Sequence, residues 1–151
     1  MTHANPHRRP ILQSTTKKSW HYAGAIGILL VSAGLLAQNI GVTRTPITQA
    51  DSSIPGKEDY ITRIDVAAGG KVDWHTHPGD EISYVMDGEI ELLVANQTPR
   101  KIKAGEGFVV PGGTVHSAKN HGNTTIKLVG VYVLDKGKPL ASPASAPAAS
   151  Y

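Results

Sequence analysis

Short runs of apolar and β-branched residues, cut by glycine and proline, fill the middle of the chain from Asp59 to Asp135. No stretch of ten residues there repeats its apolar positions at helical spacing, whereas Asp87-Gly88 separates two alternating runs, which is a strong hairpin signal. The runs cover residues 60–66, 71–76, 81–87, 89–95, 100–103, 107–110, 114–119 and 125–133. Seven or eight short strands with this density of turns predict an all-β sandwich or barrel.

The segments on either side of this domain differ from it in composition. Residues 43–58 are polar and contain Pro46 and Pro55, which predicts a linker. Residues 136–151 are rich in Ala, Ser and Pro and cannot bury enough apolar surface to fold, so we expect a disordered tail. The remaining domain, residues 59–135, is small enough that a bound metal or a homodimer would add useful stability.

An apolar stretch without charge, Tyr22 to Ala37, predicts a hydrophobic helix near the start of the chain. A basic segment before such a stretch is typical of a secretory signal, and extension to Val42 gives about the 20 residues that span a bilayer. Residues 1–42 are therefore expected to be a signal peptide or a signal-anchor transmembrane segment. Both alternatives place the domain outside the cytoplasm, either periplasmic or anchored to the inner membrane.

Charge is divided unevenly along the chain. Residues 1–50 contain five basic residues and no acidic one, while residues 51–151 contain ten basic and twelve acidic residues. The domain thus has no basic surplus that would favour nucleic acid as a partner. The chain also lacks cysteine, which excludes disulfides, thiolate metal sites and cysteine nucleophiles.

Three histidines and a glutamate are the candidate metal ligands. His75 and His77 are two residues apart, so their side chains leave the same face of a strand about 6–7 Å apart. Glu81 follows a Pro-Gly turn and can face this pair, and His116 lies on a later strand. Three imidazole nitrogens and one carboxylate suit one divalent ion of Mn, Fe, Ni, Cu or Zn, and an octahedral ion would keep two positions for substrate or dioxygen.

These residues lie in two motifs that resemble the signatures of the cupin superfamily. The first, G-x5-H-x-H-x3-E-x6-G, is met by Gly69, His75, His77, Glu81 and Gly88. The second, G-x5-P-x-G-x2-H-x3-N, is met by Gly105, Pro111, Gly113, His116 and Asn120. The resemblance covers about residues 59–135 and implies a small antiparallel β-barrel of the jelly-roll type. It also implies that the two histidines of the first motif, its glutamate and the histidine of the second motif point inward to one metal ion.

The resemblance leaves two functions open, because cupins include dioxygenases, oxalate-degrading enzymes, isomerases, lyases and non-catalytic binders. The first hypothesis is a metal-dependent, dioxygenase-type enzyme acting on a small organic molecule, since the ligand set is complete and leaves open positions. The second is a non-catalytic module that binds a small molecule or a metal as a sensor or scavenger, since no second catalytic constellation is visible.

Five other residues have predicted positions relative to the site. Arg63, Asp73 and Tyr84 could reach the mouth of the pocket as an acid, a base or a substrate anchor. Trp74 alternates with the histidines and should face away from the metal, and His121 is expected to lie in solvent.

Overall fold

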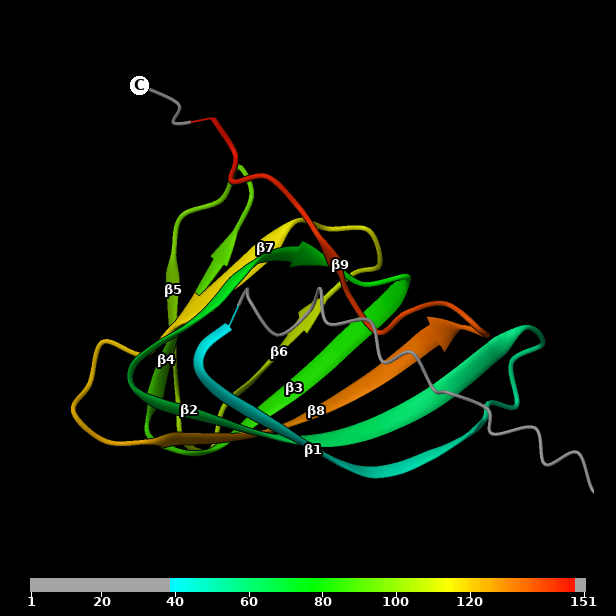
Figure 1. Cartoon of the computed structure of the whole chain (residues 1–151), viewed down its shortest axis with the longest axis horizontal. Coiled ribbons are helices and arrows are strands. Elements are labelled where there is room, and N and C mark those ends of the chain that lie inside the picture. The colour runs from blue at the N-terminus through cyan, green and yellow to red at the C-terminus, as the bar shows by residue number, and fades with distance from the viewer. Residues whose placement is uncertain (1–38, 149–151) are drawn as a thin grey trace, which may run out of the picture. The chain divides into compact units, whose positions relative to one another are not determined.

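Nine β-strands and no helix make up residues 39–148, the part of the chain that the computed structural model describes (Figure 1). The strands are β1 (Asn39–Asp51), β2 (Lys57–Thr76), β3 (Gly79–Asp87), β4 (Glu89–Val94), β5 (Arg100–Lys103), β6 (Gly107–Val110), β7 (His116–Lys119), β8 (Ile126–Asp135) and β9 (Ser142–Pro143). The prediction of an all-β domain is therefore confirmed over this range.

The strands form one antiparallel sheet that curls into a nearly closed barrel of the jelly-roll type (Figure 1). Its main path runs β5-β4-β7-β2-β8-β3-β6, and β1 and β9 both pair with β2 beside this path. The two outer strands of the path, β5 and β6, also contact each other, which brings the edges of the sheet together. A closed sheet of this kind encloses an interior into which every second side chain points.

The long strand β2 joins the two parts of the barrel. Its first half pairs with β8 from Lys57 to Val66, and its last residues pair with β7, where His75 lies opposite His116. The change of partner occurs around Gly70, where a Cβ atom would lie 2.7 Å from the carbonyl oxygen of Ala67. Only glycine fits so close to backbone, which accounts for the Gly-Gly pair before the first histidines.

The interior is built from alternating residues on facing strands. The buried hydrophobic cluster consists of Ile64, Val66, Val85, Ile90, Leu92, Ile102, Phe108, Val110, Ile126 and Leu128. On β3 the alternation also turns Glu81 and Ser83 inward, in line with Val85. The barrel interior is thus apolar in one part and polar where β2, β3 and β7 meet.

The prediction of a linker over residues 43–58 is wrong, because β1 continues to Asp51 and pairs with β2 along its length. The sequence of β1 gives little sign of a strand, because most residues of β1 are exposed and Pro46 lies within it. Pro46 is tolerated because, among the strands of residues 39–148, β1 pairs with β2 alone, and the register shifts between Pro46 and Thr48. The pairing begins at Asn39, so the last residues of the predicted segment 1–42 belong to the barrel.

The C-terminal tail was also wrongly predicted to be disordered as far as residue 148. After β8 the chain returns along β2, where Ser142 pairs with Thr76, and the amide of Ala144 donates to the Trp74 carbonyl at 2.9 Å. Figure 1 shows this red segment crossing the barrel beside the end of β2. The segment has little side chain to bury, and its place is set by backbone hydrogen bonds, which composition does not reveal.

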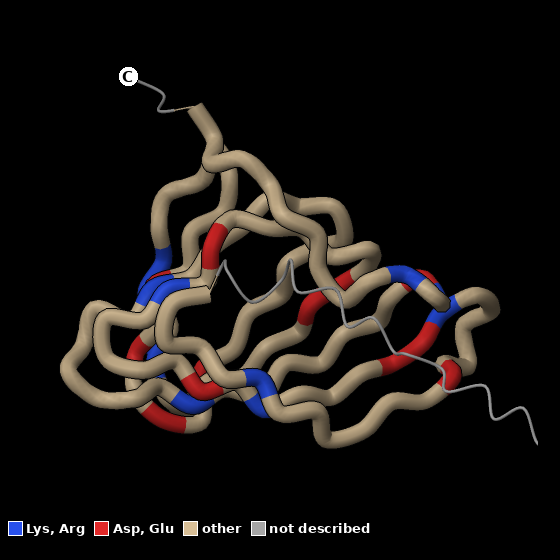
Figure 2. The backbone as a smooth tube through the Cα atoms, in the orientation of Figure 1, with Lys and Arg blue, Asp and Glu red and all other residues tan. Residues whose placement is uncertain are grey.

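The predicted hydrophobic helix, Tyr22 to Ala37, lies outside the described residues. Residues 39–148 contain no helix long and apolar enough to cross a membrane. Basic and acidic positions are interspersed along the barrel (Figure 2).

Candidate metal centre

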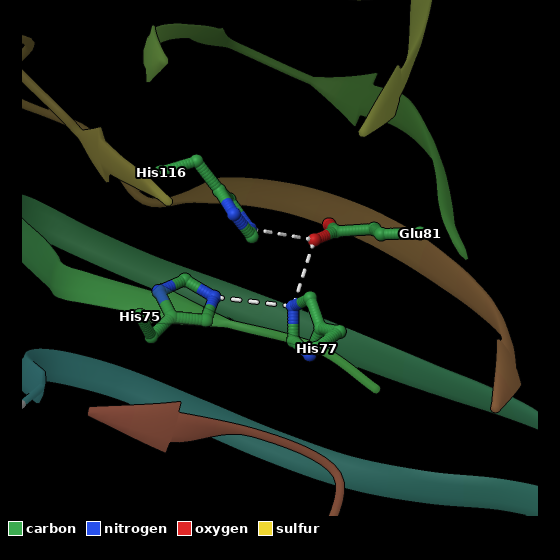
Figure 3. A group of neighbouring side chains, drawn as sticks. All are labelled: His75, His77, Glu81 and His116. Atoms are coloured by element: carbon green, nitrogen blue, oxygen red, sulfur yellow. Dashed lines mark hydrogen bonds and ion pairs between the residues drawn. The ribbon is translucent and has the colours of Figure 1, made fainter. Parts of the chain in front are cut away.

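Four buried side chains from three strands and one turn meet inside the barrel (Figure 3). His75 is the penultimate residue of β2 and His77 follows the strand, Glu81 points inward from β3, and His116 begins β7. One nitrogen or oxygen atom from each residue lies within 4.8 Å of the other three. The structure therefore brings together all four residues that the sequence nominated as ligands.

The ring nitrogens that face one another are the Nε2 atoms. Oε2 of Glu81 lies 3.0 Å from Nε2 of His77 and 3.1 Å from Nε2 of His116. Nε2 of His75 lies 3.1 Å from Nε2 of His77. Three imidazoles and one carboxylate are thus aimed at a common centre.

The opposite ring nitrogens are all held by backbone carbonyls. The Nδ1 atoms of His75, His77 and His116 lie 2.7, 2.6 and 2.9 Å from the carbonyl oxygens of Asp73, Leu140 and Thr114. A carbonyl only accepts, so each Nδ1 bears the hydrogen, and a neutral ring then has its lone pair on Nε2. Three lone pairs and a carboxylate therefore face each other, which is stable only with positive charge between them.

This arrangement fits a divalent transition ion. A donor set of three imidazoles and one carboxylate suits such ions, and ligating histidines usually donate their second N–H to a carbonyl or carboxylate. An ion at this centre would also supply positive charge beside the buried, ionised carboxylate of Glu81.

Ionisation of the cluster is set by its burial and by its internal contacts. Burial lowers the pKa of His75 to about 4, with the charge of His116 acting in the same direction, so this ring is neutral at pH 7. Burial alone would raise the pKa of Glu81, but hydrogen bonds from His116 and His77 outweigh it and lower this pKa. The hydroxyl of Ser83 donates to Oε1 of Glu81 at 2.6 Å and fixes the carboxylate.

Tyr132 on β8 packs beside the four candidate ligands. Its ring packs against that of His77 with centroids 4.9 Å apart. Burial and the negative charge of Glu81 raise the pKa of its hydroxyl, so it remains protonated. Gly130 makes room for this ring, because a Cβ atom there would lie 2.8 Å from the tyrosine hydroxyl.

A cavity of about 240 Å³ adjoins the cluster. It is lined by Asn39, Val42, Arg44, Val72, Asp73, His75, His77, Leu140, Ala141, Ser142 and Pro143. Its walls therefore come from β1, from the end of β2 and from the C-terminal segment that crosses beside β2. A smaller inner hollow of about 30 Å³ continues past Arg44 and His75 to Glu81, His116 and Tyr132.

Among the residues at this site that were not nominated from the sequence are Arg44, Tyr132 and Leu140. Arg44 lay in the supposed linker, although its alternation with Val42 on an inward face was a usable signal. Tyr132 could have been found from the alternation of β8, where it is in step with Leu128. Leu140 takes part through its backbone carbonyl, for which no side-chain signal exists.

The remaining nominated residues divide between the cavity and the outer surface. Asp73 lines the cavity, whereas Tyr84 is exposed on β3 and Arg63 pairs with Asp65 at 3.0 Å. Trp74 lines a separate surface hollow with Pro147. His121 lies at the exposed surface, as expected, although it does contact Glu91 there, at 2.7 Å.

Residues 62–132 match the family model of the cupin domain, and both the barrel and the four converging side chains lie in this range or beside it. This part of the chain is a cupin domain. A cupin-like protein from Thermotoga maritima shares the fold, with a TM-score of 0.60 at 18% identity, over 70% of this chain and 78% of that one. The cupin motifs read from the sequence therefore correspond to a cupin barrel.

Plant germin-like proteins and a solved oxalate oxidase are among the similar proteins. Germin-like protein subfamily 2 member 2 of Arabidopsis thaliana is 42% identical over 77 residues, which are 48% of this chain and 35% of that protein. A structure of oxalate oxidase in complex with the substrate analogue glycolate has a TM-score of 0.55 at 27% identity, covering 68% of this chain and 55% of that one. This cupin thus spans about a third of the length of the germin-like protein.

Proposed function

We propose that this cupin binds one divalent transition ion through His75, His77, Glu81 and His116. The supporting observation is the set of three Nε2 lone pairs and one carboxylate around a common buried centre, with each histidine oriented by a carbonyl. The bound ion would supply Lewis-acid and redox chemistry at the inner end of the cavity. The residues around it exclude bulk water and hold the Tyr132 hydroxyl in its protonated form.

We further propose that the site is enzymatic and of the dioxygenase type, acting on a small organic molecule. A cavity of about 240 Å³ beside the ligands offers space for such a substrate next to the ion. In a dioxygenase reaction both atoms of O2 enter the product, so electrons balance without an added reductant. The likeness to an oxalate oxidase supports an oxygen-dependent reaction, since that protein has the same kind of barrel.

Metal analysis followed by an oxygen-uptake screen tests this proposal. The purified full chain should contain about one transition ion, and the loaded protein should consume oxygen with some member of a panel of aromatic and dicarboxylic acids. Labelled 18O2 should then place both oxygen atoms in the product. A protein that contains the ion and binds a panel member without consuming oxygen would instead be the binding module of the second hypothesis.

The location of the barrel is a separate proposal. We propose that it lies outside the cytoplasm, released from or anchored to the inner membrane, because basic residues without acidic ones precede the apolar stretch from Tyr22 to Ala37. A reporter that is active only after export, fused to the C-terminus of the full chain, should be active. A reporter active only in the cytoplasm would contradict the proposal.

A further inference from the structure

Ser83 is a buried polar residue beside the candidate metal ligands. It lies on β3 two residues after Glu81, so both side chains leave the same inward face of the strand. The residues opposite Ser83 on the neighbouring strands are Phe108 of β6 and Gly130 of β8. Neither of these two residues has a side-chain acceptor, so the buried hydroxyl needs a partner elsewhere inside the barrel.

The carboxylate of Glu81 is this partner. The Ser83 hydroxyl donates to Oε1 of Glu81 at 2.6 Å, which is the short distance typical of a hydroxyl bound to an ionised carboxylate. A serine hydroxyl has a single hydrogen to donate, and this hydrogen is used on Oε1. Both residues are buried, so bulk water does not compete for either group.

The two oxygens of Glu81 therefore have different surroundings. Oε2 faces Nε2 of His77 and Nε2 of His116 at 3.0 and 3.1 Å (Figure 3), whereas Oε1 accepts the hydrogen of Ser83. The last torsion of a glutamate side chain has no sharp rotameric preference, so a contact at one oxygen decides how the carboxylate is turned. Ser83 thus holds Oε1 and leaves Oε2 toward the histidines.

The orientation of this carboxylate matters because a glutamate can give an ion one oxygen or two. An octahedral ion held by three imidazoles and one carboxylate oxygen keeps two positions for other ligands. A second oxygen from the same carboxylate would leave only one such position. Groups that hydrogen-bond to a ligating carboxylate tune the metal site, and Ser83 is such a group for Glu81.

We propose that Ser83 is a positioning residue that limits Glu81 to one oxygen ligand and so keeps a second open position on the bound ion. The inference rests on the proposed function for the presence of an ion. It adds how the chain preserves room for two small ligands, such as water and dioxygen, on that ion. Loss of the hydroxyl, with every metal ligand unchanged, should free the carboxylate to turn and to offer both oxygens.

Water-proton relaxation of the Mn2+-loaded full chain tests the proposal, because relaxation by bound Mn2+ grows with the number of exchangeable water molecules on the ion. Ser83→Ala should lower the relaxation per bound ion to about half the value of the unchanged chain, since one of two open positions is lost. Ser83→Thr retains a hydroxyl and should keep the original value. Ser117→Ala is the matched control and should also keep it, because Ser117 is equally buried but donates to the Val72 carbonyl at 2.7 Å.

Free Mn2+ is measured in the same samples by electron paramagnetic resonance, which gives the amount bound and shows that each variant has an intact metal site. Unchanged relaxation per bound ion in Ser83→Ala would overturn the inference while leaving the proposed metal site in place. An equal fall in Ser117→Ala, or in Ser83→Thr, would also overturn it, because the loss would then not come from the hydroxyl on Glu81. An unchanged chain that binds no Mn2+ would contradict the metal site itself and overturn the inference with it.

Discussion

The three histidines of the candidate metal centre are oriented by carbonyls at different distances along the chain. His75 and His116 each donate to the carbonyl two residues earlier, so their orientation is set within their own strand or turn. His77 donates to Leu140, 63 residues later. The ring of His77 consequently depends on a contact that the local chain cannot supply.

Replacing His77 should weaken metal binding more than replacing any surface histidine. His77→Ala removes one of the three Nε2 donors and leaves Glu81 with one imidazole contact, so zinc affinity measured by calorimetry should fall by about tenfold or more. His121→Ala is the matched control, because His121 lies at the surface beside Glu91. Equal zinc affinities for the two variants would mean that this cluster is not the metal site.

At the scale of elements, the C-terminal segment is attached to the barrel at several points. The ammonium of Lys136 pairs with Asp51 at 2.7 Å, and the Gly137 amide donates to Glu58 at 2.9 Å. Beyond Leu140, β9 pairs with the end of β2. The composition of this C-terminal segment predicts disorder. The segment nevertheless forms one wall of the cavity, and its Leu140 carbonyl orients the candidate metal ligand His77.

Truncation of this segment should lower metal affinity although all four ligands remain. A chain ending at Lys138 lacks the Leu140 carbonyl, so His77 loses its orienting acceptor, and zinc affinity should fall about tenfold. A chain ending at Ala144 keeps β9 and every hydrogen bond named above and should bind zinc like the full chain. If both truncated chains match the full chain in calorimetry, Leu140 does not orient His77.

The attachment of this segment should also depend on pH. Glu58 accepts hydrogen bonds from the Gly137 amide and from the Gln49 side chain. Both bonds, the first more strongly, lower the pKa of Glu58 below its ordinary value of 4.5. A lowered pKa in the folded state means that the stabilisation is present above about pH 4.5 and is lost as pH falls through the lower, folded value.

Hydrogen exchange of the Gly137 amide measures this dependence. Its protection factor should fall in acid, while the amide of Ala95, which donates to Val115 at 2.9 Å, should keep its protection. In Glu58→Gln the side chain still accepts but no longer titrates, so protection at Gly137 should not change over the same pH range. A Gly137 amide that is equally protected throughout would contradict the assignment.

The candidate metal ligands could be predicted from the sequence because spacing on a strand determines the face on which a side chain lies. His75 and His77 shared a face by their spacing, and Glu81 followed a readable turn. The strand β1 and the C-terminal segment were missed, since their places are set by pairing with β2 rather than by apolar residues of their own. Pairing between distant segments leaves little periodic signal when most residues stay exposed.

At the scale of the whole molecule, the candidate metal centre brings together residues of β2, β3 and β7. A bound ion would therefore act as a crosslink between strands that are 41 residues apart at their extremes, His75 and His116. Loss of the ion would leave the buried lone pairs and carboxylate without a compensating positive charge.

Removal of the ion should lower the melting temperature of the barrel. A ligand that binds only the folded state stabilises it by about 4 kcal/mol at a thousandfold excess over its Kd, which corresponds to a shift of many degrees for a domain of this size. The comparison is between metal-loaded and chelator-treated protein by calorimetry. Equal melting temperatures, on protein shown to contain the ion, would mean that the metal does not link the strands.

The position of Leu140 has a consequence for the order in which this barrel becomes complete as it folds. The four candidate ligands lie between residues 75 and 116, whereas the carbonyl that orients His77 comes 63 residues after it. A barrel in which β2, β3 and β7 have met before the C-terminal segment docks along β2 therefore has His77 without its acceptor and a cavity without one wall. We expect docking of this segment to be the folding step that gives the site its full metal affinity.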